Sequence, residues 1–275
     1  MAKGSYQETP AYPFVPGLEG AGIVLEAGPD AKLREGGRVA VFSQGTMQEV
    51  GNFPEDACIP IPDSMSFEDA AAFQIAYGTS HLALTKRADL QPGETLVVLG
   101  AAGGVGLTAV EIGAALGARV VAIARGKDKL AAAKEAGATI LIDSDEVPDL
   151  KAELKRIGGA DVIYDPVGGK SGTAAFAALN RGGRFLLIGF AGGNIPDLPL
   201  NHALVKNIAI HGLYWGGYRT LSPEVLRDSM TQLFQMVADG RLKPRPAMSM
   251  PLSELAKAYD LLETRRSIGK IVVTM

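Results

Sequence analysis

A glycine-rich turn that joins an apolar run to a helical pattern is the segment best suited to bind phosphate. Residues 100–106 read Gly-Ala-Ala-Gly-Gly-Val-Gly, directly after the apolar run 95–99. A strand-to-helix turn without large side chains lets a pyrophosphate approach the backbone N–H groups at the positive end of the helix. The spacing matches the glycine fingerprint of dinucleotide sites except at its first position, which is Ala101. It predicts a cofactor site rather than a purely structural turn. The residues expected to bind the pyrophosphate are Gly103, Gly104, Val105 and Gly106.

The end of the next apolar run indicates which dinucleotide binds. An NAD site would place Asp or Glu there, to accept hydrogen bonds from the ribose hydroxyls. Here the run 119–124 is followed by Arg125, and no acidic residue occurs between Glu111 and Asp128. Arg125, with Lys129 just beyond it, would attract a ribose 2′-phosphate. These residues favour NADP(H) over NAD(H), although an arginine on a solvated loop would give the same pattern.

Residues for metal binding or nucleophilic catalysis are scarce in this chain. Cys58 is its one cysteine, which excludes an intrachain disulfide and a four-cysteine zinc site. The histidines, His81, His202 and His211, are widely spaced, and there is no G-x-S-x-G element. We therefore expect no metal ion, and we interpret Cys58 and His81 as packing residues.

The bulk composition is that of a globular protein without affinity for polyanions. The 275 residues are 47% hydrophobic and 21% charged, with a formal net charge of −3. Such a charge gives no general attraction to nucleic acid or anionic lipid. The first ten residues lack the apolar stretch of a signal peptide, and the longest apolar run, 96–110, is broken by glycines. These features, with the single cysteine, favour a cytoplasmic location.

The glycine-rich turn belongs to a regular alternation of short apolar runs and longer helical patterns. Such alternation is typical of βαβ units and of a parallel sheet buried on both faces. The predicted strands are 95–99, 119–124, 139–142, 161–165, 184–189 and 208–213. Six strands in this arrangement predict an α/β fold, a Rossmann-type doubly wound parallel sheet, over residues 78–214.

The residues on either side of this segment follow a different pattern. Residues 20–62 contain short strand-like runs broken by turn residues, without a helical period. After residue 215, two amphipathic helices, around 223–238 and 252–265, precede a short terminal strand. We therefore expect a discontinuous β-rich domain, residues 1–77 and 215–275, around the inserted α/β domain.

Taken together, these stretches resemble the medium-chain dehydrogenase/reductase superfamily, and within it the zinc-independent NADPH:quinone oxidoreductases. The matching stretches are PFVPGLEGAGIV, AYGTSHLAL, LQPGETLVVLGAAGGVGLTAVEIGAALGARV, AGATILID, DVIYDPVGG, GGRFLLIGFAGG, LYWGGY and GKIVVTM. They are spread over nearly the whole chain. The resemblance implies a GroES-like substrate and catalytic domain that carries the inserted Rossmann NADP-binding domain.

The resemblance explains the stretch PGLEGAG at residues 16–22. In zinc alcohol dehydrogenases of the superfamily, a histidine stands at the position of Leu18 and binds the catalytic metal, which a leucine cannot do. Alcohol oxidation would then lack its Lewis acid, whereas a quinone or an enone spreads the incoming charge over its own conjugation. The resemblance therefore implies NADPH-dependent reduction of quinones or α,β-unsaturated carbonyls by direct hydride transfer, without metal.

The resemblance also implies roles for individual residues. Thr79 and Tyr6 are the implied catalytic residues, because Thr79 would lie near the nicotinamide and Tyr6 matches a tyrosine of the quinone pocket. Besides the glycine-rich turn, the implied cofactor-binding residues are Thr79, Arg125, Lys129, Asp165, Val167, Gly189, Phe190, Ala191 and Tyr214. Tyr214 and Trp215 either border the substrate cleft or form a buried aromatic pair.

The chain departs from the family pattern in two places. A tyrosine that packs near adenosine in family members is Ser144 here. Family members also begin several dozen residues earlier, with barrel strands and an N-x-x-D element at the substrate site, so we expect the GroES-like domain to lack its first strands. Two alternatives stay open: reduction of an enoyl thioester, and an NADPH-binding sensor or interaction protein without catalytic activity.

The last predicted strand, 208–213, is expected at an edge of the sheet. It is short and apolar, with little charge to discourage pairing. Edge strands of this kind readily pair with a second copy across a two-fold axis. We expect a homodimer through residues 208–214, helped by apolar residues in 190–200, unless the segment 194–202 covers the edge and leaves a monomer.

Overall fold

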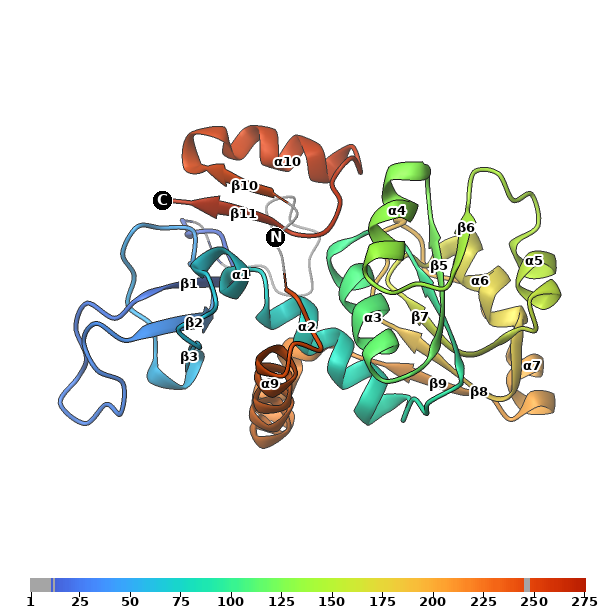
Figure 1. Ribbon diagram of the computed structural model, residues 1–275, viewed down its shortest axis with the longest axis horizontal. Helices are drawn as coiled ribbons and strands as arrows, with labels where there is room; N and C mark the ends of the chain where they lie inside the picture. The colour runs from blue at the N-terminus through green and yellow to red at the C-terminus, as the bar shows by residue number, and fades with distance from the viewer. Residues whose placement is uncertain (1–10, 12, 245–247) are drawn as a thin grey trace. The chain divides into compact units, whose positions relative to one another are not determined.

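The computed structural model describes residues 11, 13–244 and 248–275 (Figure 1). These residues form two compact units: a first unit up to Ile75 and from Pro244 on, and a second unit, Ala76–Lys243. The strands are β1 (Glu19–Ile23), β2 (Arg38–Phe42), β3 (Cys58–Pro60), β4 (Thr95–Leu99), β5 (Arg119–Ala124), β6 (Ile140–Asp143), β7 (Ala160–Asp165), β8 (Leu179–Leu187), β9 (Ala209–Gly212), β10 (Met248–Pro251) and β11 (Ile271–Thr274). The α-helices are α1 (Phe67–Ala71), α2 (Gln74–His81), α3 (Gly104–Ala115), α4 (Lys127–Glu135), α5 (Leu150–Arg156), α6 (Gly169–Ala177), α7 (Leu200–Lys206), α8 (Tyr218–Leu221), α9 (Pro223–Ala238) and α10 (Leu255–Glu263).

The second unit is built on a six-stranded sheet in the order β6-β5-β4-β7-β8-β9. Every neighbouring pair in it is parallel. The strand order reverses between β4 and β7, which is the switch point where doubly wound sheets bind ligands. The predicted Rossmann-type fold is confirmed. β8 begins at Leu179 rather than at residue 184, because an irregular extension precedes the point where its register with β7 shifts.

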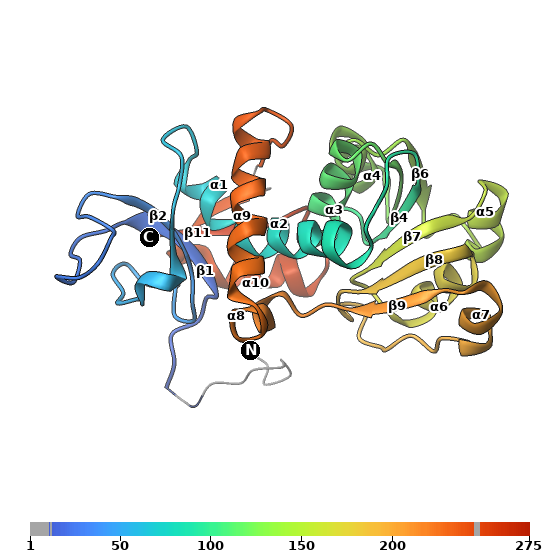
Figure 2. The same cartoon turned by 90° about the horizontal axis from the view of Figure 1, so that it is seen from below.

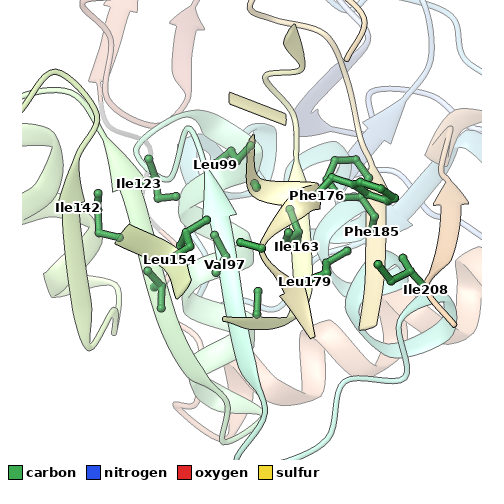
Figure 3. Close-up of a cluster of buried hydrophobic side chains, with 14 residues drawn as sticks. Val97, Leu99, Ile123, Ile142, Leu154, Ile163, Phe176, Leu179, Phe185 and Ile208 are labelled. Carbon is green, nitrogen blue, oxygen red and sulfur yellow. The ribbon is translucent and has the colours of Figure 1, made fainter. Parts of the chain in front are cut away.

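The sheet of the second unit is buried on both faces. Figure 3 shows its apolar side chains, among them Val97 on β4 and Ile163 on β7, which are fully buried. Phe176 from α6 and Phe185 from β8 meet edge to face, with ring centroids 5.4 Å apart. Continuous burial explains why these strands are uninterrupted apolar runs rather than alternating ones.

Helices connect successive strands of this sheet as crossovers. In Figures 1 and 2, α3 and α4 lie on one face of the sheet, and α5 and α6 on the other. Local sequence sets their ends: Asp149 Oδ1 accepts the N–H of Ala152 at 2.9 Å and caps α5, and glycines precede α4 and α6. Over the ranges that the structure describes, no helix combines the length and apolarity needed to cross a membrane.

The first unit contains the antiparallel sheet β1-β2-β3 and the parallel pair β10-β11. The PGLEGAG stretch enters β1, and Gly17 has φ +95°; a Cβ there would lie 2.5 Å from Thr46 Oγ1. Glycine is therefore required at this turn. Glu19 accepts the N–H of Ile75 at 2.8 Å through Oε2 and pairs with the ammonium group of Lys270 through Oε1. One carboxylate thus joins three segments that are distant in sequence.

Helix α9 belongs to the second compact unit, whereas residues 215–275 were expected in the β-rich domain. His81 Nδ1 on α2 lies 2.8 Å from Ser229 Oγ on α9, and Figure 2 shows the two helices crossing. After α9, the N–H of Lys243 donates to Glu111 Oε1 of α3 at 2.6 Å. These contacts explain why the compact unit extends to residue 243; the functional domain boundaries stay a prediction.

The buried imidazole of His81 makes the stability of the fold depend on pH. Burial lowers the pKa of His81 from 6.5 to about 4. Above pH 6.5 the imidazole is neutral in both the folded and the unfolded chain. Between these two values only the unfolded chain binds the proton, so the free energy of unfolding falls by about 1.4 kcal/mol per pH unit, about 3 kcal/mol in all.

Denaturant titrations of the wild type and of His81→Gln between pH 7.5 and pH 4 measure this effect. The variant keeps a polar group opposite Ser229 but has no ionisable ring, so its unfolding free energy should fall less steeply with acid than that of the wild type. Equal slopes for the two proteins would show that His81 is not the group responsible.

Candidate functional site

The glycine-rich turn lies between β4 and α3, at the carboxyl end of a central strand. Gly103 is the N-cap of α3, no side chain caps this end, and the first turn contains no acidic residue. Gly103 is exposed, and Gly104 and Val105 are half-buried. The first N–H groups of α3 and the positive end of its dipole are therefore available to an anion.

One glycine lets the start of α3 lie close to the turn that follows β4, and a second lets the loop after β7 approach that turn. A Cβ on Gly106 would overlap the carbonyl oxygen of Gly100 and would lie 2.9 Å from the Cα of Ala101. Gly100 has φ +58°, and a Cβ there would lie 2.8 Å from Cγ2 of Val167. Both positions exclude a side chain, so the fold requires glycine there, and this requirement is visible in the sequence as the glycine pattern.

Arg125 and Lys129 follow β5, as predicted. Arg125 is exposed and Lys129 is half-buried. Between them, Gly126 has φ +81° and donates its N–H to Asp143 Oδ2 at 3.0 Å; Oδ1 of the same carboxylate accepts the N–H of Asp145. An acidic residue of the neighbouring strand β6 therefore supports the turn that carries Arg125, although no acidic residue directly follows β5.

The loops that follow β7 and β8 are joined by backbone hydrogen bonds. The N–H of Ala191 donates to the carbonyl of Pro166 at 3.0 Å, and the N–H of Gly192 to the carbonyl of Val167 at 2.8 Å. The loop at residues 189–191 therefore lies beside Val167. Phe190 in this loop is 40% exposed. The structure therefore brings together Val167 and residues 189–191, which are among the implied cofactor-binding residues.

Asp165 ends β7 with its side chain inside the protein. Its Oδ1 accepts the N–H groups of Val167 and Gly168, both at 2.8 Å. Burial raises the pKa of this carboxyl group, and the two N–H donors oppose that shift. Because Asp165 is fully buried, its link to a cofactor would run through the loop that it holds.

Thr79 lies on α2, where the neighbouring Ser80 is held by a buried network of hydroxyl groups. Ser80 Oγ lies 2.8 Å from Thr108 Oγ1 of α3 and 2.9 Å from the hydroxyl of Tyr164 on β7. Thr108 Oγ1 also donates to the carbonyl of Ala76 at 3.0 Å. Burial raises the pKa of Tyr164, so its hydroxyl stays protonated and can donate. The network fixes α2, and with it Thr79, against α3 and β7.

The aromatic residues singled out in the sequence differ in their burial. Trp215 is buried against α2, where a Cβ on Gly78 would lie 2.6 Å from its ring atoms. Tyr214 is 44% exposed, so the two do not form a buried pair. Tyr6 lies outside the described residues.

No described group of three or more His, Cys, Asp or Glu side chains could hold a metal ion. His81 is bonded to Ser229, and His202 and His211 lie on α7 and β9. Cys58 lies on β3, where burial raises the pKa of its thiol. Leu18, which precedes β1, supplies no metal ligand.

A parallel sheet with a glycine-rich turn at its switch point, followed by a basic residue after the next strand, defines a dinucleotide-binding protein of the Rossmann type. Two family models match this chain: Alcohol dehydrogenase GroES-like domain over residues 1–63, and Zinc-binding dehydrogenase over residues 104–235. Both belong to the class of medium-chain dehydrogenases and reductases.

The relatives narrow this class to one family. Quinone oxidoreductase-like protein 2 homolog of Nematostella vectensis is 40% identical over 98% of this chain and 76% of its own length. The structure of Escherichia coli quinone oxidoreductase complexed with NADPH has a TM-score of 0.88 and 30% identity, covering 98% of this chain and 85% of its own. The Thermus thermophilus quinone oxidoreductase, also solved with NADPH, has a TM-score of 0.84 and 33% identity, covering 99% and 85%. The chain belongs to the quinone oxidoreductase family of the medium-chain dehydrogenase/reductase superfamily.

The buried polar side chains that hold the site's backbone in place were not predicted from the sequence. Ser80, Thr108 and Tyr164 come from three elements, and no spacing rule connects them. Asp143 could have been found, because it ends the apolar run ILID and parallel strands end at the same edge of a sheet.

Proposed function

We propose that this protein reduces quinones or α,β-unsaturated carbonyls with NADPH. The observation that carries the proposal is the switch point of the parallel sheet, where the glycine-rich turn after β4 and the loop after β7 meet at Gly100 and Val167. Dinucleotides bind at this place in doubly wound sheets. Membership of the quinone oxidoreductase family and the NADPH complexes of two similar structures support an oxidoreductase that uses NADP(H).

Each part of the site has one task in this proposal. The N-terminus of α3 binds the pyrophosphate, and Arg125 with Lys129 binds the 2′-phosphate. Val167 and the loop 189–191 hold the nicotinamide, and Thr79 lies beside it. NADPH, when bound, supplies the hydride. The chain contributes orientation and exclusion of water, since the groups placed here are mostly backbone and apolar.

The substrate class follows from the chemistry that these residues lack. The residues assigned to the site above do not include an acid–base pair of side chains, and Leu18 stands where the resemblance implies a metal-binding histidine. An acceptor that delocalises the incoming charge needs least help from such a site. Quinones and conjugated carbonyls have this property, and so do enoyl thioesters.

Steady-state assays on the whole chain test the activity. With NADPH present, we expect loss of its absorbance on adding a benzoquinone or a short conjugated enone. An enoyl thioester tested in parallel decides between the proposed substrates and the closest alternative. We expect no oxidation of primary alcohols with NADP+, and no change in rate after treatment with a metal chelator.

Two results would contradict this proposal in different ways. A rate that disappears with the chelator and returns with zinc would overturn the metal-free chemistry. NADPH binding without turnover of any acceptor would favour the sensor or interaction protein.

Tyr6 and Thr79 are proposed as catalytic residues, so Thr79→Val should lower kcat more than it changes the Kd for NADPH.

Arg125 should set the preference for NADPH over NADH. A charge-assisted contact to a phosphate is worth roughly 1.5–3 kcal/mol, which corresponds to about ten-fold or more in affinity. In Arg125→Ala, the Kd for NADPH measured by fluorescence titration should rise by about this factor, while the Kd for NADH stays unchanged. Lys134→Ala, which removes a cation from the exposed side of α4, is the matched control and should change neither value. Equal losses for both nucleotides would refute the assignment.

We also propose that the protein is a homodimer through β9, the last strand of the sheet. Strand β9 has a neighbour on one side, and Ile195, Leu200, Leu204 and Val205 near this edge are more than half exposed. Pairing of two copies would cover these side chains. Light scattering over a dilution series should give twice the chain mass of 28.7 kDa. Ile210→Lys should lower it to the monomer value; a dimer that persists in this variant would exclude the edge.

A further inference from the structure

Asp165 stands where the two halves of the parallel sheet meet. It is the last residue of β7, whose neighbour β4 leads into the glycine-rich turn. Its carboxylate is fully buried, and Oδ1 accepts the N–H groups of Val167 and Gly168. Its main-chain carbonyl accepts the N–H groups of Ile188 and Gly189 at 2.9 and 3.3 Å. One residue therefore holds the loops after β7 and β8.

The loop that Asp165 holds extends to the switch point. Val167 Cγ2 packs so closely on Gly100 that a Cβ on this glycine would lie 2.8 Å away. On its other side, the carbonyl of Val167 accepts the N–H of Gly192, where a Cβ would lie 2.7 Å from that oxygen. Val167 is thus fixed between the phosphate turn and the loop at 189–192, and its position depends on the hydrogen bonds from Asp165.

The other oxygen of this carboxylate indicates that the arrangement carries an energetic cost. Oδ2 of Asp165 is buried and has no hydrogen-bond partner among the described residues. It lies against α6, where a Cβ on Gly172 would overlap it. A buried, half-satisfied carboxylate destabilises a fold, and an apolar residue would remove that cost. The interactions that offset this cost are the two hydrogen bonds that Oδ1 accepts in the loop at the amino end of α6.

We propose that Asp165 is a positioning residue: by holding the backbone of Val167 and Gly168, its carboxylate fixes Val167 at the switch point and thereby the nicotinamide end of the bound cofactor. The inference rests on the proposed binding of NADPH. Asp165 acts through the loop without touching the cofactor. Its effect should therefore be confined to one end of the dinucleotide, whereas a general loss of structure would affect both ends.

Comparing the binding of two ligands distinguishes effects at the two ends of the site. NADPH occupies both ends, whereas 2′,5′-ADP carries the adenosine phosphates but no nicotinamide. In Asp165→Ala, the Kd for NADPH should rise about ten-fold through the two lost charge-assisted hydrogen bonds, with a larger fall in kcat, while the Kd for 2′,5′-ADP stays within about two-fold. Asp165→Asn keeps an oxygen acceptor for both N–H groups, so it should restore NADPH binding to near the wild-type value.

Two further variants control for stability. Asp161→Ala removes an aspartate from the start of the same strand, where Oδ2 accepts the N–H of Thr95 at 2.8 Å and Oδ1 the amide of Asn180 at 3.0 Å. It should lower stability without changing the ratio of the Kd values for NADPH and 2′,5′-ADP.

Gly172→Ala places a methyl group against Oδ2 from α6. It should weaken NADPH binding alone, which tests the proposal even if Asp165→Ala does not fold.

The outcomes are distinct. Equal weakening of NADPH and 2′,5′-ADP in Asp165→Ala, no weakening of either, or an Asp161→Ala variant with the same selective loss would overturn the positioning role. If the wild type binds NADPH but reduces no acceptor, the proposed activity fails while the binding comparison still decides the role of Asp165. A wild type that binds neither ligand overturns both.

Discussion

The close crossing of α3 over the end of β4 is the constraint on which the rest of the second unit depends. Because no side chain fits at Gly106, the first turn of α3 lies directly on the backbone of Gly100 and Ala101, just after β4, and its N–H groups lie at the carboxyl edge of the sheet. The missing side chain at Gly100 leaves room for Val167 of the loop after β7. The proposed phosphate end and nicotinamide end of the site would therefore both be set by one backbone arrangement at the switch point.

Buried polar groups then hold this arrangement in place. Ser80, Thr108 and Tyr164 join α2, α3 and β7 through hydroxyl groups, and Asp143 and Asp165 hold the turns after β5 and β7 through backbone N–H groups. Each of these groups has at least one partner, so it restricts the backbone without the full penalty of an unsatisfied buried polar group. A site that consists largely of backbone is thereby fixed before any ligand binds.

The sequence was sufficient for the features that repeat at fixed spacing. Apolar runs predicted all six strands of the parallel sheet, and the glycines predicted the turn between β4 and α3, because both are patterns of local sequence. That this turn binds phosphate stays a prediction. The supporting polar network could not be predicted, since Ser80 and Tyr164 are 84 residues apart in sequence and 2.9 Å apart in space. The contact of α9 with His81 could not be predicted for the same reason, because it is non-local. The cytoplasmic location and the role of Tyr6 stay predictions.

The glycine and the acid of the PGLEGAG stretch have structural roles that do not involve the side chain of Leu18. Gly17 is required by its contact with Thr46, and Glu19 is required to join Ile75 and Lys270, so these residues have structural reasons to be present. Leu18 has no such link through its side chain in the described contacts; its main-chain carbonyl alone accepts a hydrogen bond, from Ser43. Under the proposed function, a leucine there suits a reaction in which the acceptor itself delocalises the charge, because such a reaction needs position more than it needs a Lewis acid.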